Sequence, residues 1–131
     1  MRIHAHLPEE LWPESVQAAA YITNRTPSRR LDWKTPFETL QLLLGILNPR
    51  PNIAHLKVYG CRAYVLKPKI PRRQKLEPRA YIDYLVRYDL MNIYCIWIPS
   101  EEKVVRMRDV MFNENLLYDP NQPDLASQLR E

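Results

Sequence analysis

Apolar residues recur at helical spacing in the first part of the chain. Over residues 7–25, LPEELWPESVQAAAYITNR, we expect a helix whose buried stripe consists of Trp12, Val16, Ala19, Ala20 and Thr23. Pro8 suits a first helical turn, where Glu9 and Glu10 complement the helix dipole. Pro13 follows early in the segment, where a proline costs least or moves the true start of the helix along the chain.

A second helix is predicted from its start signal. TPFE places Thr35 as the cap, Pro36 as the first helical residue and Glu38 three positions after the cap. Gly45 can end this helix. The connector ILNPRPN cannot continue it, because it contains two prolines, and we therefore place a domain boundary there.

The hydrophobic period changes to two after the connector, which is typical of strands. HLKVYGCRAYV, residues 55–65, predicts a strand with Tyr59, Cys61, Ala63 and Val65 on one face and Val58, Tyr64 and Leu66 on the other. RAYIDYLVRYD, residues 79–89, predicts another, with one face formed by Ile82, Tyr84, Val86 and Tyr88 and the other by Tyr81, Asp83, Leu85 and Arg87.

Further strands are predicted in NIYCIWI and KVVRMRDVMF, which the turn-like PSEE separates. The residues after Phe112 are expected to be loop or linker. Together these elements predict an α+β fold: a helical segment over residues 1–52, a small antiparallel β-barrel over 53–113 and a tail over 114–131.

Composition indicates a folded, soluble chain, with 46% hydrophobic and 26% charged residues. The sequence contains neither an apolar run long enough to span a membrane nor an N-terminal signal pattern, so we expect no membrane partner. Cys61 and Cys95 lie far apart without a CxxC motif, which favours a reducing, intracellular compartment.

Charge is the most unevenly distributed property of the chain. Residues 57–79 carry eight cations against Glu77, a net charge of +7 that leaves −3 for the rest of a chain whose total is +4. The densest part, KPKIPRRQK, predicts an exposed loop between two strands that can lay cations along a nucleic-acid backbone. The candidate DNA contacts are Lys57, Lys67, Lys69, Arg72, Arg73, Lys75 and Arg79. The alternative is a solvated basic loop without a partner.

Other chemistry is weakly represented. His4 and His6 have no further ligand at a recognisable metal spacing, and the acids are scattered, so we predict no catalytic residue, metal, cofactor or small-molecule substrate. Cys61 is expected to be a small buried residue. Core packing is the expected role of the tryptophans, with base stacking as the alternative, for Trp12, Trp33 and Trp97.

Six motifs in order give the chain a recognisable resemblance. LPEELW, YITNRTP, TPFE, HLKVYGCRAYV, KLEPRAYI and RDVMF followed by NE span residues 7–114. The chain resembles the integrase region of copia-type long-terminal-repeat retrotransposon polyproteins. The resemblance implies the last helices of a ribonuclease-H-like catalytic core, followed by a small Src-homology-3-like barrel that holds DNA or neighbouring integrase subunits.

The resemblance also implies that the chain is catalytically inactive. The family's metal-binding acids precede the LPEELW motif, and residues 1–6 are too few to carry them. We therefore expect a truncated integrase remnant with residual nonspecific DNA binding, nuclear if it is expressed. The alternatives are a protein-interaction or oligomerisation module without DNA affinity, and a decayed open reading frame without function.

Several residues depart from the family pattern. Asp83 and Arg87 stand where the family has glycine, and Cys95 stands where it has arginine. Each change can arise from one C-to-T or G-to-A transition, which suggests cytosine deamination in a silenced repeat. The chain retains only 2 glycines. Replacing a glycine that needs a positive φ, or one that sits against a neighbour's backbone, destabilises a small barrel.

Overall fold

The first helix begins later than its hydrophobic pattern suggests. The computed structural model describes residues 1–47, 50–66 and 80–121, and its first elements are a 3-10 turn η1 (Glu9–Leu11) and helix α1 (Trp12–Thr23). Pro13 occupies the first turn of α1. A helix that began at Leu7 would need the N–H that Pro13 lacks, so the start moves to a position where that donor is not required.

The second helix forms as its start signal predicts. Helix α2 (Pro36–Leu43) follows a short 3-10 turn η2 (Arg29–Leu31). The Glu38 N–H donates to Thr35 Oγ1 over 3.1 Å, and the Thr35 N–H donates to Glu38 Oε2 over 2.7 Å, which confirms the capping box. Gly45 follows the helix end with φ +77, and the Ile46 N–H donates back to the Gln41 carbonyl over 3.0 Å.

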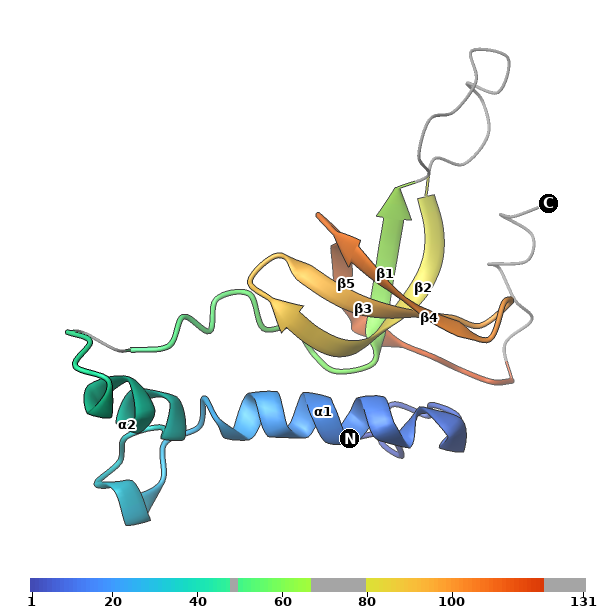
Figure 1. Ribbon diagram of the computed structural model, residues 1–131. Helices are drawn as coiled ribbons and strands as arrows, with labels where there is room; N and C mark the ends of the chain where they lie inside the picture. The colour runs from blue at the N-terminus through green and yellow to red at the C-terminus, as the bar shows by residue number, and fades with distance from the viewer. Residues whose placement is uncertain (48–49, 67–79, 122–131) are drawn as a thin grey trace.

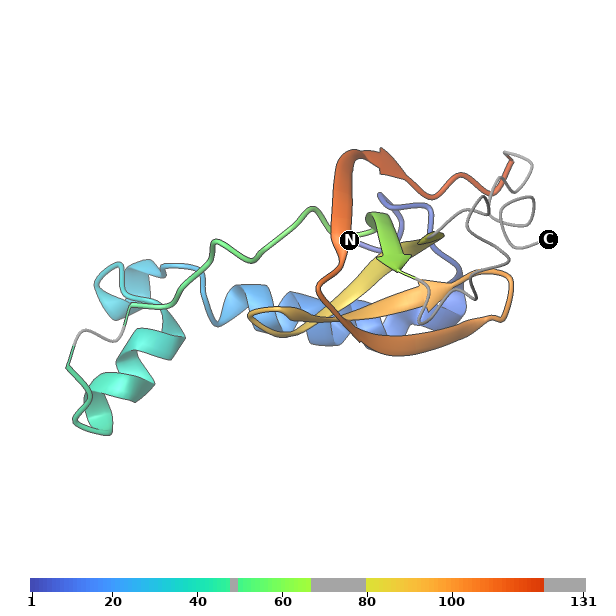
Figure 2. The same ribbon diagram turned by 90° about the horizontal axis from the view of Figure 1, so that it is seen from above.

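The rest of the described chain forms one five-stranded antiparallel sheet (Figure 1). Its strands are β1 (Cys61–Leu66), β2 (Ala80–Leu90), β3 (Ile93–Ile98), β4 (Lys103–Arg108) and β5 (Met111–Leu117), in the order β4-β3-β2-β1-β5. Helix α1 lies along one face of this sheet, whereas α2 lies beyond the end of α1 and away from the strands in both views (Figures 1 and 2).

Strand β1 is shorter than the alternating pattern predicts. It begins at Cys61 instead of His55, because Gly60 has φ +78 and donates its N–H to the Leu85 carbonyl over 2.9 Å. Within the strand the expected alternation is confirmed, since Cys61, Ala63 and Val65 are buried.

The predicted faces of β2 do not separate core from solvent. Both sides of this strand are buried in its central part, from Ile82 to Val86, including Asp83 at 1% exposure. Strand β2 lies in the middle of the sheet order, and α1 packs against it. A strand covered on both faces loses the polar alternation that marks a half-buried one.

The last predicted strand is in fact two strands. KVVRMRDVMF divides at Asp109, which has φ +55, and β5 then continues to Leu117. The expectation of a loop after Phe112 is therefore wrong. Strands β4 and β5 are the two edges of the sheet, yet only Asp109 and Val110 join them. That link spans at most about 11 Å, so the sheet must curl to bring its edges together.

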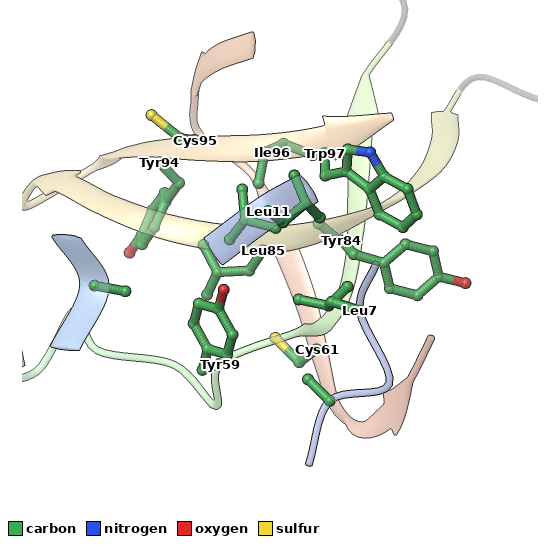
Figure 3. Packing of buried hydrophobic residues seen from close by; sticks show 14 of the residues in the cluster. Leu7, Leu11, Tyr59, Cys61, Tyr84, Leu85, Tyr94, Cys95, Ile96 and Trp97 are labelled. Carbon is green, nitrogen blue, oxygen red and sulfur yellow. The ribbon is translucent and has the colours of Figure 1, made fainter. Parts of the chain in front are cut away.

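The core joins the N-terminal residues to the sheet (Figure 3). Its buried members from the N-terminal side are Ala5, Leu7, Leu11 and Ala18, and from the sheet side they include Cys61, Leu85, Val86, Ile96 and Trp97. The division into residues 1–52, 53–113 and 114–131 stays a prediction.

Helix α1 buries a different stripe from the one predicted. Trp12 and Val16 are 60% and 57% exposed, whereas Ala18 is buried, as is Leu11 just before the helix. The sequence misleads here because the polar residues Glu14 and Ser15 bond to the sheet side, so polarity does not mark the outer face. The prediction that the tryptophans pack in the core is thus correct for Trp97, which is 6% exposed. It is wrong for Trp12 and for Trp33, which is 71% exposed.

Candidate nucleic-acid interface

The predicted basic loop is anchored at one end of the β1–β2 pair. Leu66 and Ala80 are paired at the end of that ladder, so the two ends of the intervening segment are held side by side. Most of the predicted DNA contacts lie in this segment, outside the described residues: Lys67, Lys69, Arg72, Arg73, Lys75 and Arg79. Their grouping on one surface stays a prediction.

Lys57 is the one predicted contact that the described residues include. Lys57 precedes β1, whereas the basic segment follows that strand. The two are therefore separated by the length of β1, about 16 Å. Lys57 lines a shallow groove with Tyr64, Met111 and Glu114. The Glu114 carboxylate accepts the Val58 N–H over 2.9 Å in the same region, so an acid accompanies this cation.

A polar joint connects α1 to the sheet, and Arg87 is its centre. The Arg87 guanidinium lies 3.3 Å from the Glu14 carboxylate and donates to Gln17 Oε1 over 2.5 Å. It also donates from Nη2 to the Cys95 Sγ over 3.0 Å. The joint was missed by the sequence analysis, because it depends on side chains that are far apart in the chain.

A second part of the joint is aromatic. The Tyr21 hydroxyl lies 2.6 Å from His55 Nε2, and the Tyr21 ring stacks on Tyr88 with 5.6 Å between centroids. The Tyr94 hydroxyl donates to the His55 carbonyl over 2.8 Å, and the Arg25 guanidinium lies 3.6 Å from the centre of the Tyr21 ring. Burial, and then the charge of Arg25, lowers the pKa of His55.

Burial raises the thiol pKa of both cysteines, including Cys95 of the joint. Burial raises the pKa of the Cys61 thiol to about 12, so the thiolate needed of a nucleophile does not form near neutral pH. Both cysteines are buried and free. Among the described residues, no group of three or more histidines, cysteines or acids is placed to hold a metal ion. The geometry of the joint serves to fix α1 on the sheet.

An apolar surface lies at the end of α2. The exposed fractions are 55% for Leu40, 81% for Leu43, 67% for Leu44 and 89% for Leu47. Clustered exposed leucines of this kind usually mark a surface that another protein covers. Within the part of the chain that the structure describes, no helix is both long enough and apolar enough to cross a membrane.

Comparison with known proteins identifies the sheet. A small, strongly curled antiparallel sheet of five strands is consistent with an SH3-like domain. The model of the retroviral polymerase SH3-like domain matches residues 61–126, and the chain belongs to this family. No solved structure was found to match the chain.

The relatives are polyproteins of copia-type retrotransposons. The chain is similar to the retrovirus-related Pol polyprotein from transposon TNT 1-94 of Nicotiana tabacum, at 38% identity over 112 residues, which is 85% of this chain and 8% of that protein. It is 32% identical to the Pol polyprotein from transposon RE2 of Arabidopsis thaliana, over 85% of this chain and 7% of the relative. The chain thus spans less than a tenth of the length of these relatives, and the similarity supports an origin in a retrotransposon.

Proposed function

We propose that this chain is a catalytically inactive part of a retrotransposon integrase that binds DNA without sequence specificity through the basic segment between β1 and β2. The observation that carries the proposal is the concentration of charge: residues 57–79 carry +7 in a chain whose total is +4, and +5 of this lies in the segment itself, residues 67–79. Several cations on one connector neutralise several phosphates, and that is sufficient for sequence-independent affinity. Acting on DNA, such a chain would work in the nucleus.

The finer proposal concerns the helices. In it, α1 and α2 are the end of a ribonuclease-H-like core, and the curled sheet is a barrel that holds DNA or a neighbouring integrase subunit. The extent of the similarity supports this proposal, because the relatives match about 112 residues of this chain, more than the sheet alone provides. The chain itself is then not an enzyme.

The test uses fluorescence anisotropy to measure binding of the chain to a labelled DNA duplex at several salt concentrations. If about four phosphates are engaged, the logarithm of the association constant falls against the logarithm of salt concentration with a slope of about −3.6. A five-Ala variant of the basic segment is expected to lose most of this affinity and to show a flatter slope. Its substituted residues are Lys67, Lys69, Arg72, Arg73 and Lys75. Salt-independent binding, or undiminished binding by this variant, would refute the proposal.

A matched control comes from the edge of the sheet. Lys103 and Arg106 are cations already paired with Glu101 and Asp89. Replacing them with Ala removes charge from the chain without touching the basic segment, and it is expected to leave duplex affinity nearly unchanged. If the control variant loses as much affinity as the basic-segment variant, overall charge accounts for binding and the proposed site does not.

A second candidate function rests on the leucines at the end of α2. Their exposure favours an oligomerisation module in which this apolar surface packs against another copy of the chain. Size-exclusion chromatography with light scattering is expected to show a dimer that Leu43→Lys with Leu47→Lys converts to a monomer. A monomer at all concentrations would exclude self-association, and a dimer that survives both changes would place its interface elsewhere.

A further inference from the structure

Residues 28–34 form a closed loop between the two helices. The Ser28 N–H donates to the Lys34 carbonyl over 3.1 Å, and the Trp33 N–H donates to the Ser28 carbonyl over 2.9 Å. The Lys34 N–H donates to the Leu31 carbonyl over 3.0 Å, which holds η2 against the end of the loop. The conformation is therefore fixed by backbone hydrogen bonds at both ends.

The loop presents an aromatic ring to solvent in an unusual backbone conformation. Trp33 is 71% exposed, and its φ of +62 follows a φ of +54 at Asp32. Side chains with a Cβ rarely occupy this left-handed region, and two in succession need surrounding structure to hold them. The hydrogen bonds at Ser28 provide that support. Because the backbone that carries the ring is fixed before any ligand arrives, binding loses little backbone conformational freedom.

Three cations lie in the same loop as the ring. Arg29, Arg30 and Lys34 are exposed, and Asp32 is the one acid in the loop sequence SRRLDWK. Within the described residues, none of these three cations takes part in an ion pair. The loop lies with α2 beyond the end of α1, on the side away from the sheet (Figures 1 and 2). Its charges are thus free to meet a polyanion that the sheet does not contact.

We infer that residues 28–34 bind single-stranded nucleic acid, with Trp33 stacking on an unpaired base and Arg29, Arg30 and Lys34 contacting the flanking phosphates. An exposed ring among cations is the combination that sequence-tolerant single-strand binders use. Paired bases in a duplex already stack on one another, so the ring selects unpaired bases. A protein partner fits less well, because the loop carries three cations against one acid, a net charge of +2 that favours a polyanion.

This inference goes beyond the proposed duplex binding and uses another surface. The test measures binding of a labelled oligothymidylate of about 12 nucleotides to the full chain by anisotropy. Trp33→Leu is expected to weaken binding about 5- to 160-fold, which is the range for loss of one stacked base, whereas Trp33→Phe retains most of the affinity. Trp12→Leu is the matched control, because Trp12 is similarly exposed on α1, and it is expected to bind as the parent chain does.

A second variant separates stacking from folding. Trp33→Gly removes the ring while its backbone tolerates the positive φ, so it is expected to fold normally and to bind as weakly as Trp33→Leu. Changing Arg29 and Arg30 to Ala is expected to reduce the salt slope by about 1.4, since single strands contribute about 0.7 for each phosphate contact.

The outcomes distinguish this surface from the basic segment. Oligonucleotide binding that is unchanged in Trp33→Leu and Trp33→Gly would overturn the inference, as would an equal loss for duplex and single strand. Loss of binding in Trp12→Leu as well would indicate a general effect on the protein and would also overturn it. Trp33→Leu is also made in the five-Ala variant of the basic segment. There it is expected to weaken single-strand binding by the same factor as in the parent chain, whether or not the proposed duplex binding holds.

Discussion

Arg87 donates a hydrogen bond to the Cys95 sulfur over 3.0 Å, across the pair of strands β2 and β3. Both residues depart from the family pattern described above, and they meet each other in the fold. Neither Arg87 nor Asp83 has a positive φ, so the backbone conformation of this chain gives no reason for glycine at either position. Arg87 instead connects the sheet to Glu14 and Gln17 of α1.

The first prediction concerns that connection. Arg87→Met keeps the aliphatic volume of the side chain and removes its donors, and it is expected to lower the free energy of unfolding by about 1 to 2 kcal/mol. The loss arises because the guanidinium and the Glu14 carboxylate are both largely shielded, with side-chain exposures of 24% and 21%. Urea denaturation followed by circular dichroism measures the change.

Arg106 provides the control for this change. Its ion pair with Asp89 is more open to water, with 59% of the arginine side chain exposed. Arg106→Met is therefore expected to alter stability by less than about 0.5 kcal/mol. Equal losses in the two variants would show that the joint between α1 and the sheet adds nothing beyond a surface ion pair.

The two glycines allow a second prediction. Gly45 and Gly60 have φ values of +77 and +78, but a Cβ at Gly45 meets nothing within 4 Å, whereas one at Gly60 would lie 2.3 Å from the Ala5 Cβ. Gly45→Ala is expected to cost about 1 kcal/mol from backbone strain alone. Gly60→Ala adds a clash with the N-terminal residues and is expected to cost about 2 to 4 kcal/mol.

Thermal unfolding of both variants checks this difference. Both variants bear the same backbone strain. The additional loss of stability in Gly60→Ala therefore measures how firmly residues 1–7 pack against the start of β1. Equal melting temperatures would mean that this N-terminal packing does not contribute to the stability of the fold.

The third prediction is a loss of stability in acid through His55. Burial and the Arg25 charge lower the pKa of His55 in the folded chain below its usual 6.5. The unfolded chain then binds more protons as the pH falls below 6.5, so the folded state loses stability in that direction. Chemical denaturation at about pH 7.5 and about pH 5 is expected to show this decline.

Comparison of histidine variants assigns that effect. His55→Gln is expected to reduce the decline between the two pH values, because the titrating group is gone. His4 and His6 are exposed, and replacing both with Gln is expected to leave the decline in place. If all variants declined equally, the acid sensitivity would come from other groups, and the contact between Tyr21 and His55 would not be responsible.

The fourth prediction is a loss of stability in base. Burial, and then the nearby Glu114, raises the pKa of Cys61 from its usual 9.0 to about 12. Between these values the unfolded chain has released the thiol proton and the folded chain has not, so stability falls as the pH rises. Denaturation at about pH 8 and about pH 10 measures the slope, which Cys61→Ala is expected to reduce.

Thiol chemistry gives an independent check. Because both cysteines are buried, a thiol reagent is expected to label neither in the native chain and both in the unfolded one. Rapid labelling of Cys61 under native conditions would contradict both the burial and the predicted alkaline slope.

Local signals in the sequence were sufficient for the elements that depend on neighbours in the chain. The cap of α2 could be predicted because Thr35 and Glu38 satisfy each other's backbone within one turn. The alternation of Cys61, Ala63 and Val65 could be predicted because successive residues of a strand point to opposite faces. The charge of the candidate DNA-binding segment is likewise a property of composition, which no fold can change.

Tertiary structure decided which surfaces are covered. The buried face of α1 is the one whose Glu14 and Ser15 contact Arg87 and Tyr59. Hydrophobicity alone therefore selected the wrong residues, Trp12 and Val16, as buried. The meeting of Arg87 with Cys95 depends on the pairing of β2 with β3. The exposure of Trp33 was not predicted because, among the described residues, no neighbouring segment covers the loop of residues 28–34 that carries it. Periodicity records which residues share a side, but only packing between distant segments determines whether that side meets protein or water.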